Sequence, residues 1–188
     1  MKTCLVGCGG IAAVHGSVLT SGIDTEFVAA ADIKPEKAQS YAENFHTKPY
    51  PSLESMLEAE KPDVLHICTP HYLHVPMAIY ALEQNINVFM EKPPAISFDQ
   101  LEELKKAAAK SEAQLGFCYQ NRYNASIRAA KDLIDSGKAG KVLGARAFVT
   151  WCRGAAYYTE SGWRGSLKTE GGGVLINQSV HTQDLLCF

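Results

Sequence analysis

Short apolar runs alternate with amphipathic stretches along roughly the first 120 residues. The apolar runs are continuous rather than alternating, which is typical of strands buried on both faces of a parallel sheet. The stretches between them have the length and spacing of helices. We therefore expect an α/β fold with helices on both faces of a parallel sheet. The expected strands are 3–7, 26–32, 48–50, 63–68, 87–90 and 115–119, and the expected helices are 11–20, 35–45, 53–60, 74–84 and one from an N-cap at Asp99 to 110.

The pattern changes after residue 120. Residues 125–136 predict one more helix, 142–153 a long extended strand, 154–173 a polar glycine-rich loop and 174–188 a final helix. That last helix ends on apolar residues without a cap, whereas free termini are usually polar or docked. We therefore expect a first domain at 1–120 and a second at 121–188 whose sequence stops early.

Composition excludes several classes of protein. The chain has 188 residues and a formal net charge of -2, so it lacks the basic excess of nucleic-acid-binding proteins. No apolar run approaches the roughly 20 residues that span a bilayer. The six cysteines form no Cys-x-x-Cys pair and most lie in apolar runs, which favours a reduced, cytoplasmic protein. His71 and His74 lack the companions of a zinc site, so no metal is expected.

A glycine-rich turn follows the first expected strand. The run Gly7-Cys8-Gly9-Gly10-Ile11-Ala12 has the form Gly-x-Gly-x-x-Ala and opens a helix. Such a turn lets the backbone approach a pyrophosphate, which the helix N-terminus then binds. Alone it is weak evidence, because a tight turn of this kind also serves packing. Asp32 follows the second strand and would bind the ribose hydroxyls, so we predict a dinucleotide site that favours NAD over NADP. Lys34 lies two residues on and could partly rescue NADP binding, but we favour its interpretation as a solvated loop residue.

Two further motifs follow expected strands. Thr69 and Pro70 come after the third long strand and precede His74 at a helix start, while Glu91 and Lys92 end the next strand. Carboxyl ends of parallel strands are where ligands bind in such folds. A lysine beside a nicotinamide would handle the proton of a substrate hydroxyl. The alternatives are a turn shaped by Pro70 and an exposed lysine.

The final expected helix carries polar residues at helical spacing. Asn177, His181 and Asp184 are spaced i, i+4, i+7 and would share one face. Either His181 acts as an acid or base in a polar cavity, or it is buried against Asp184 for structural reasons. The helix alone favours neither.

The order of these motifs resembles the glucose-fructose oxidoreductase, inositol dehydrogenase and MocA family, over essentially the whole chain. The resemblance implies a Rossmann domain followed by the beginning of an α/β domain with a large open sheet. It implies an oxidoreductase acting on a hydroxyl of a sugar or cyclic polyol, and a homo-oligomer. It assigns proton handling to Lys92 and His181 and places Glu91 near the nicotinamide ribose. It puts Trp163 and Arg164 in a loop close to the active site and Arg122 at the domain junction.

One position departs from the family pattern. Inositol dehydrogenase-like members have an aspartate where this chain has Asn177, so Asn177 is expected to orient substrate rather than relay protons. The family also continues for well over a hundred residues beyond this point. Two rival functions remain, an NAD-using glycosidase and an NAD-binding module without catalysis. Net accumulation of NADH would separate the dehydrogenase from both.

Overall fold

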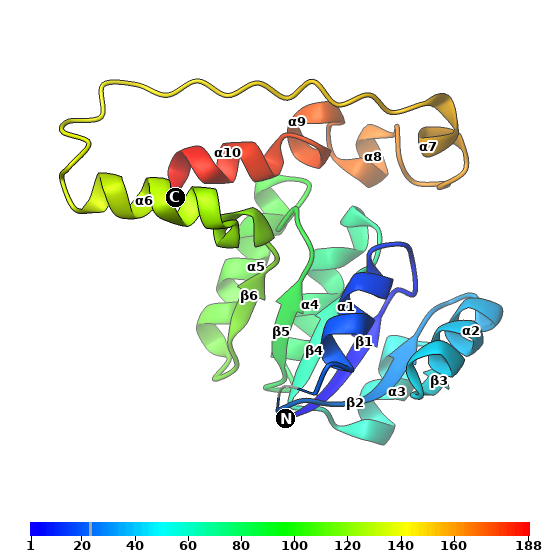
Figure 1. Ribbon diagram of the computed structural model, residues 1–188. Coiled ribbons are helices and arrows are strands. Elements are labelled where there is room, and N and C mark those ends of the chain that lie inside the picture. Colours follow the sequence, from blue (N-terminus) through cyan, green and yellow to red (C-terminus); the bar gives the residue numbers. More distant parts are fainter. Residues whose placement is uncertain (23) are drawn as a thin grey trace. The chain divides into compact units, whose positions relative to one another are not determined.

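A parallel sheet organises the first part of the chain (Figure 1). The computed structural model describes residues 1–22 and 24–188, which divide into two units, Met1–Phe117 and Cys118–Phe188. Within the described residues the strands of the first unit follow the order β3-β2-β1-β4-β5-β6, and every neighbouring pair is parallel. This order is that of a Rossmann fold, so the expected α/β fold is confirmed. The strands are β1 (Lys2–Val6), β2 (Glu26–Ala31), β3 (Lys48–Tyr50), β4 (Val64–Ile67), β5 (Asn87–Met90) and β6 (Leu115–Phe117).

Helices cover the sheet on both faces because successive strand residues point to opposite sides. Leu5 and Ala30 pack in a cluster with residues of α1 (Ala12–Leu19) and α2 (Pro35–Phe45). Their strand neighbours pack in a larger cluster with residues of the other three helices of this unit. These helices are α3 (Leu53–Glu60), α4 (His74–Leu82) and α5 (Phe98–Lys110).

The expected cap of α5 was wrong. Ser97 occupies the N-cap in an extended conformation, and its hydroxyl accepts a hydrogen bond of 3.2 Å from the backbone N–H of Gln100. Asp99 lies in the first turn instead, where its charge suits the positive end of the helix dipole. Both residue types favour a helix start, so composition alone left the cap ambiguous by two positions.

A buried carboxylate ties α3 to the strands beside it. Glu60 accepts hydrogen bonds from Lys48 Nζ at 2.8 Å and Tyr50 Oη at 2.6 Å, and its other oxygen lies 3.0 Å from Lys2 Nζ. These donors, the Lys48 ammonium first, lower the pKa of Glu60 from 4.5 to about 2. The ionised form therefore holds the edge of the sheet together at neutral pH.

The second unit, described by itself, consists of short helices and a long irregular segment. No strand is formed by the described residues 142–153, contrary to expectation. A strand needs a backbone partner, and none of the described residues pairs with this segment, whose Leu143 and Phe148 are 91% and 83% exposed. The expected loop at 154–173 contains two short helices. The helical elements are η2 (Gln120–Tyr123), α6 (Ala125–Asp135), α7 (Ala155–Thr159), α8 (Leu167–Glu170), α9 (Gly173–Asn177) and α10 (Val180–Cys187).

The single helix expected at 174–188 is broken. α9 ends at Asn177 and α10 begins at Val180. Ser179 lies at the break, where its N–H donates to Val174 O at 2.8 Å and its hydroxyl to Leu175 O at 3.2 Å. A serine hydroxyl that bonds back to the preceding turn bends a helix, which apolar periodicity does not reveal.

The cysteines differ widely in burial. Cys4 and Cys8 lie at and after β1, and burial raises the pKa of both thiols to about 12. Cys152 and Cys187 are exposed. The described residues form no disulfide. Of the helices in the described part of the chain, none has the length and apolar character to cross a membrane.

Candidate functional site

The glycine turn after β1 has two kinds of glycine. Gly7 has φ +92°, and a Cβ placed there would lie 2.8 Å from backbone atoms of Cys68 and Thr69 at the end of β4. Gly7 is therefore required by the close approach of two strand ends. A Cβ at Gly9 or Gly10 would meet nothing within 4 Å. These two residues leave open space above the turn, where a ligand can approach the backbone.

The helix that follows the turn packs closely against its neighbour. Ala12 is buried at the first position of α1, and its carbonyl accepts a hydrogen bond of 2.7 Å from Tyr41 Oη on α2. A side chain at Gly16 would overlap Tyr41 and Phe45. Ile11 precedes the helix and remains exposed. The small residues thus seat α1 on the sheet with its N-terminus at the carboxyl edge.

Asp32, directly after β2, is fastened to the glycine turn. Its Oδ2 accepts a hydrogen bond of 2.9 Å from the backbone N–H of Cys8, and its Oδ1 accepts one of 2.9 Å from the N–H of Lys34. The Lys34 side chain is exposed. A half-buried carboxylate is therefore held beside the open glycines.

The end of β4 carries an unsatisfied polar group. The hydroxyl oxygen of Thr69 is buried and has no hydrogen-bond partner within the described residues. His74, at the start of α4, lies between two backbone carbonyls, with Nε2 2.9 Å from Thr69 O and Nδ1 2.9 Å from Pro93 O. Burial lowers the pKa of His74. Neither of its nitrogens faces open space, which agrees with a structural role at the helix start and not with a metal ligand. Pro70 lies half-buried in the turn between them.

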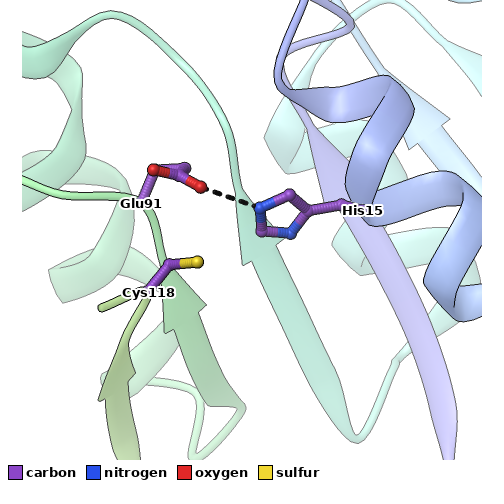
Figure 2. Close-up of side chains that lie close together, drawn as sticks. All are labelled: His15, Glu91 and Cys118. Carbon is purple, nitrogen blue, oxygen red and sulfur yellow. Dashed lines mark hydrogen bonds and ion pairs between the residues drawn. The ribbon is translucent and has the colours of Figure 1, made fainter. Parts of the chain in front are cut away.

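A histidine pair fixes the carboxylate that precedes Lys92. His15 on α1 lies with Nε2 3.0 Å from Glu91 Oε1 and Nδ1 2.9 Å from Nδ1 of His66 on β4 (Figure 2 shows His15 and Glu91). When Glu91 is ionised, the His15 nitrogen facing it must carry the proton. Burial, and secondly the neighbouring His15, lower the pKa of His66 to about 4, so His66 is neutral at neutral pH. This buried link joins the helix after the glycine turn to the end of β5, and Lys92 follows it directly.

These residues meet at one edge because parallel strands end on the same side. Gly7, Asp32, Thr69 and Glu91 follow β1, β2, β4 and β5 in turn. β1 and β4 are neighbours in the sheet. The chain adds β2 and β3 on one side of β1 and then returns to add β4, β5 and β6 on the other, and ligands bind where the strand order reverses in this way.

In the second unit, Asp184 pairs with Arg122. The Nε of Arg122 donates to Asp184 Oδ2 at 2.7 Å, and Nη2 donates to Oδ1, a two-pronged ion pair. His181 is buried, and its ring lies edge-on to Tyr119 with centroids 6.1 Å apart. Both oxygens of Asp184 are thus engaged by Arg122, which sequence spacing did not reveal.

Asn177 belongs to a separate buried network. Its Nδ2 donates to Glu170 Oε1 and, at 3.1 Å, to Tyr157 Oη. The second oxygen of Glu170 accepts a hydrogen bond of 2.7 Å from the N–H of Gly165. Glu170 is 3% exposed. Asn177 and His181 are both buried, but Asn177 lies on α9 and His181 on α10.

Trp163 and Arg164 lie in the loop before α8. The Cζ of Arg164 is 4.7 Å from the centroid of the Trp163 ring and 4.2 Å from that of Tyr157. Both distances are in the range of cation–π contacts.

Sequence reasoning did not identify His15, His66 or Glu170. His15 lies on the fourth position of α1, one turn into the helix that the glycine motif opens, so its position relative to the motif was a usable signal. His66 in an apolar strand was a second one. Glu170 stood in the glycine-rich motif but without a visible partner.

Comparison with known proteins agrees with this geometry. Residues 1–119 match the family described as "Oxidoreductase family, NAD-binding Rossmann fold", and residues 127–188 match the GFO/IDH/MocA C-terminal domain. The chain belongs to this oxidoreductase family. Its first part is therefore an NAD-binding Rossmann fold.

Individual relatives are similar over three quarters or more of this chain. The D-glucoside 3-dehydrogenase of Escherichia coli K12 is 29% identical over 100% of this chain and 53% of its own length. The 2,7-anhydro-N-acetylneuraminate hydratase of Mediterraneibacter gnavus is 31% identical over 76% of this chain and 38% of its own. The crystal structure of the WlbA dehydrogenase from Bordetella pertussis, in complex with NADH and UDP-GlcNAcA, superposes with a TM-score of 0.90 at 32% identity, covering 99% of this chain and 58% of that one. The chain thus spans about half the length of these relatives.

The residues present fit the cofactor that the family uses. The open space above Gly9 and Gly10 accommodates a pyrophosphate against the backbone. Asp32 offers acceptor oxygens for ribose hydroxyls. On the other side of the glycine turn, after β4, the buried Thr69 hydroxyl has hydrogen-bonding capacity to spare.

Proposed function

We propose that this chain forms the cofactor-binding domain, residues 1–120, and the beginning of the substrate domain, residues 121–188, of an NAD-dependent dehydrogenase of sugars or cyclic polyols. One observation carries the proposal: Asp32 is hydrogen-bonded to the glycine turn at the carboxyl edge of the parallel sheet. The relatives support the substrate class, since one is named a glucoside 3-dehydrogenase and another was crystallised with NADH and a sugar nucleotide.

Cofactor choice follows from Asp32. A carboxylate accepts hydrogen bonds from both ribose hydroxyls of NAD but repels the 2′-phosphate of NADP. Lys34 does not neutralise it, because Lys34 contacts Asp32 through its backbone N–H. The pyrophosphate would be lined by Gly7, Gly9, Gly10, Ile11 and Ala12. The remainder of the cofactor groove would be lined by Thr69, Pro70, Glu91 and Lys92, with buried His74 holding the backbone of Thr69 and Pro93 from behind.

Residues of this chain would accept the proton that the substrate hydroxyl loses. NAD, when bound, supplies a hydride acceptor at its nicotinamide ring. Lys92 would take the proton of the substrate hydroxyl, and the His15–Glu91 link would hold the strand end from which Lys92 projects. His181 would provide a second acid or base, and Asn177 would orient the substrate. Arg122, Trp163 and Arg164 would lie close to the substrate.

The test is turnover of a panel of sugars and cyclic polyols followed by NADH absorbance, with calorimetric titration of NAD and NADP in parallel. We expect NADH to accumulate with at least one polyol or sugar and NAD to bind more tightly than NADP. Equal affinity for the two cofactors would contradict the role of Asp32. NAD binding without turnover of any substrate would favour a binding module.

A second candidate is a reaction with no net oxidation, such as glycoside cleavage, in which the cofactor is reduced and regenerated. It is favoured by the relative named as a hydratase. Product formation without NADH accumulation would identify it.

We also propose a cytoplasmic location and a homo-oligomer. The first is supported by Cys4 and Cys68, which are buried thiols packed as small core residues, as in proteins of a reducing compartment.

A further inference from the structure

Two guanidinium groups gather on one aromatic ring in the second unit. The Cζ of Arg164 lies 4.2 Å from the centroid of the Tyr157 ring, and the Cζ of Arg153 lies 5.1 Å from the same centroid. Each arginine contacts a second ring, Arg164 that of Trp163 at 4.7 Å and Arg153 that of Trp151 at 5.5 Å. Two positively charged side chains therefore contact the same tyrosine ring.

Neither arginine is directly paired with a carboxylate of the described residues. Among residues 1–22 and 24–188, neither Arg153 nor Arg164 forms an ion pair, and the Nε of Arg164 is buried without a hydrogen-bond partner. Arg122 in the same unit shows the contrast, because its Nε and Nη2 are both filled by Asp184. Leaving a buried donor unsatisfied costs about 1–3 kcal/mol, and more for a charged group. An anion beside the solvent-accessible part of the half-buried Arg164 side chain would balance its charge.

The loop that carries Arg164 is held in place independently of any ligand. The N–H of Gly165 donates to Glu170 Oε2 at 2.7 Å, and the hydroxyl of Thr169 donates to Trp163 O at 2.6 Å. The contacts with the Tyr157 and Trp163 rings further restrict the Arg164 guanidinium. A binding group ordered in advance loses less entropy when its ligand arrives.

We propose that Arg153 and Arg164 form an oxyanion site that selects acidic sugars, taking the carboxylate or phosphate of the substrate. Guanidinium edges match both groups in geometry and bind them through paired charge-assisted hydrogen bonds. The exposed ring of Trp151 and the ring of Tyr157 border the site and offer an apolar surface for the sugar itself. The inference rests on the proposed function, whose substrate class it narrows to anionic sugars.

The experiment is calorimetric titration of the full chain, with and without saturating NAD, using D-glucuronate, D-glucose 6-phosphate and D-glucose as probes. We expect at least one anionic probe to bind ten-fold or more tightly than glucose, and added salt to weaken only the anionic probes. A preference for glucuronate would identify a carboxylate ligand, and one for glucose 6-phosphate a phosphate ligand.

Variants locate the site. Arg164→Gln and Arg153→Gln should each lower affinity for the preferred anion about ten-fold or more and leave glucose binding unchanged. Arg164→Lys should retain part of the affinity, because it keeps the charge but loses the planar edge. Arg146→Gln is the matched control, since Arg146 is an exposed arginine in the same irregular segment. Circular dichroism and melting of each variant verify folding, and Arg153→Gln remains informative if the Arg164 variants unfold.

Three results would overturn the inference. They are equal affinity for glucose and both anions, no binding of either anion while NAD still binds, and unchanged anion affinity in both glutamine variants. The second result would leave the proposed function intact. Anion binding through the arginines without any NAD binding would instead refute the proposed cofactor and retain the site.

Discussion

Substitution by alanine should have different effects on the two kinds of glycine in the turn after β1. It should lower stability at Gly7 and NAD affinity at Gly9. Gly7→Ala adds a methyl group at φ +92°, 2.8 Å from backbone atoms of Cys68 and Thr69. The left-handed conformation costs a residue with a Cβ roughly 1–2 kcal/mol. Overpacking against backbone that cannot rotate away costs about 1–3 kcal/mol more. We therefore expect a loss of roughly 2–5 kcal/mol of unfolding free energy from these two sources.

Thermal unfolding followed by far-ultraviolet circular dichroism measures this loss. At about 2–4 °C per kcal/mol for a chain of this length, the melting temperature should fall by roughly 4–20 °C. Gly9→Ala has open space around the added methyl group and an unstrained backbone, so its melting temperature should stay near that of the unchanged chain. The methyl group would occupy the place of the pyrophosphate, and NAD affinity should fall at least ten-fold, or about 1.4 kcal/mol.

Gly144→Ala is the control, since an added methyl group at Gly144 also meets open space, but this glycine lies far along the chain from the turn. It should change neither melting nor NAD binding. A Gly7→Ala protein that melts like the unchanged chain would refute the steric argument. A Gly9→Ala protein that binds NAD normally would show that the open space above the turn is not the pyrophosphate site.

The remaining predictions concern substitutions of single side chains. Asp32→Ala should weaken NAD binding by about ten-fold and reduce the preference over NADP, measured by calorimetry; an unchanged preference would contradict the ribose contact. Lys92→Ala should lower kcat by orders of magnitude with NAD affinity within a few-fold, His181→Ala should also be severe, and Asn177→Ala should act mainly on KM; loss of only tens of per cent with Lys92→Ala would make that residue a bystander. Glu60 has a folded pKa of about 2 against an ordinary 4.5, so its contribution to stability is present above about pH 4.5 and is lost as the pH falls toward 2. Glu60→Gln should flatten that part of the curve of stability against pH, and an unchanged curve would refute this role.

The sequence predicted the Rossmann part well because its signals are local. Buried parallel strands are continuous apolar runs, and the glycine turn combines backbone conformation and helix start in six residues. Their order along the chain also placed Asp32, Thr69 and Glu91 at one edge without any knowledge of contacts.

Partner choice between distant residues was not predictable in the same way. Nothing near Asp184 in the sequence distinguishes Arg122 from His181 as its partner, since either satisfies a carboxylate. The same applies to Glu91 and His15, which are 76 residues apart. The strand expected at 142–153 failed for a related reason, because an extended sequence becomes a strand only when another backbone pairs with it.

The contrast among the cysteines has a chemical consequence. Alkylating reagents react with thiolates, and a thiol whose pKa is about 12 supplies almost none at neutral pH. Cys8 therefore stays inert in the middle of the turn that would cradle the cofactor, and Cys4 stays inert behind it. Exposed Cys152 and Cys187 lie in the other unit. A maleimide dye should accordingly label the second unit in the folded protein and leave the glycine turn unmodified. A dye on Cys152, which directly precedes Arg153, would report on the proposed oxyanion site.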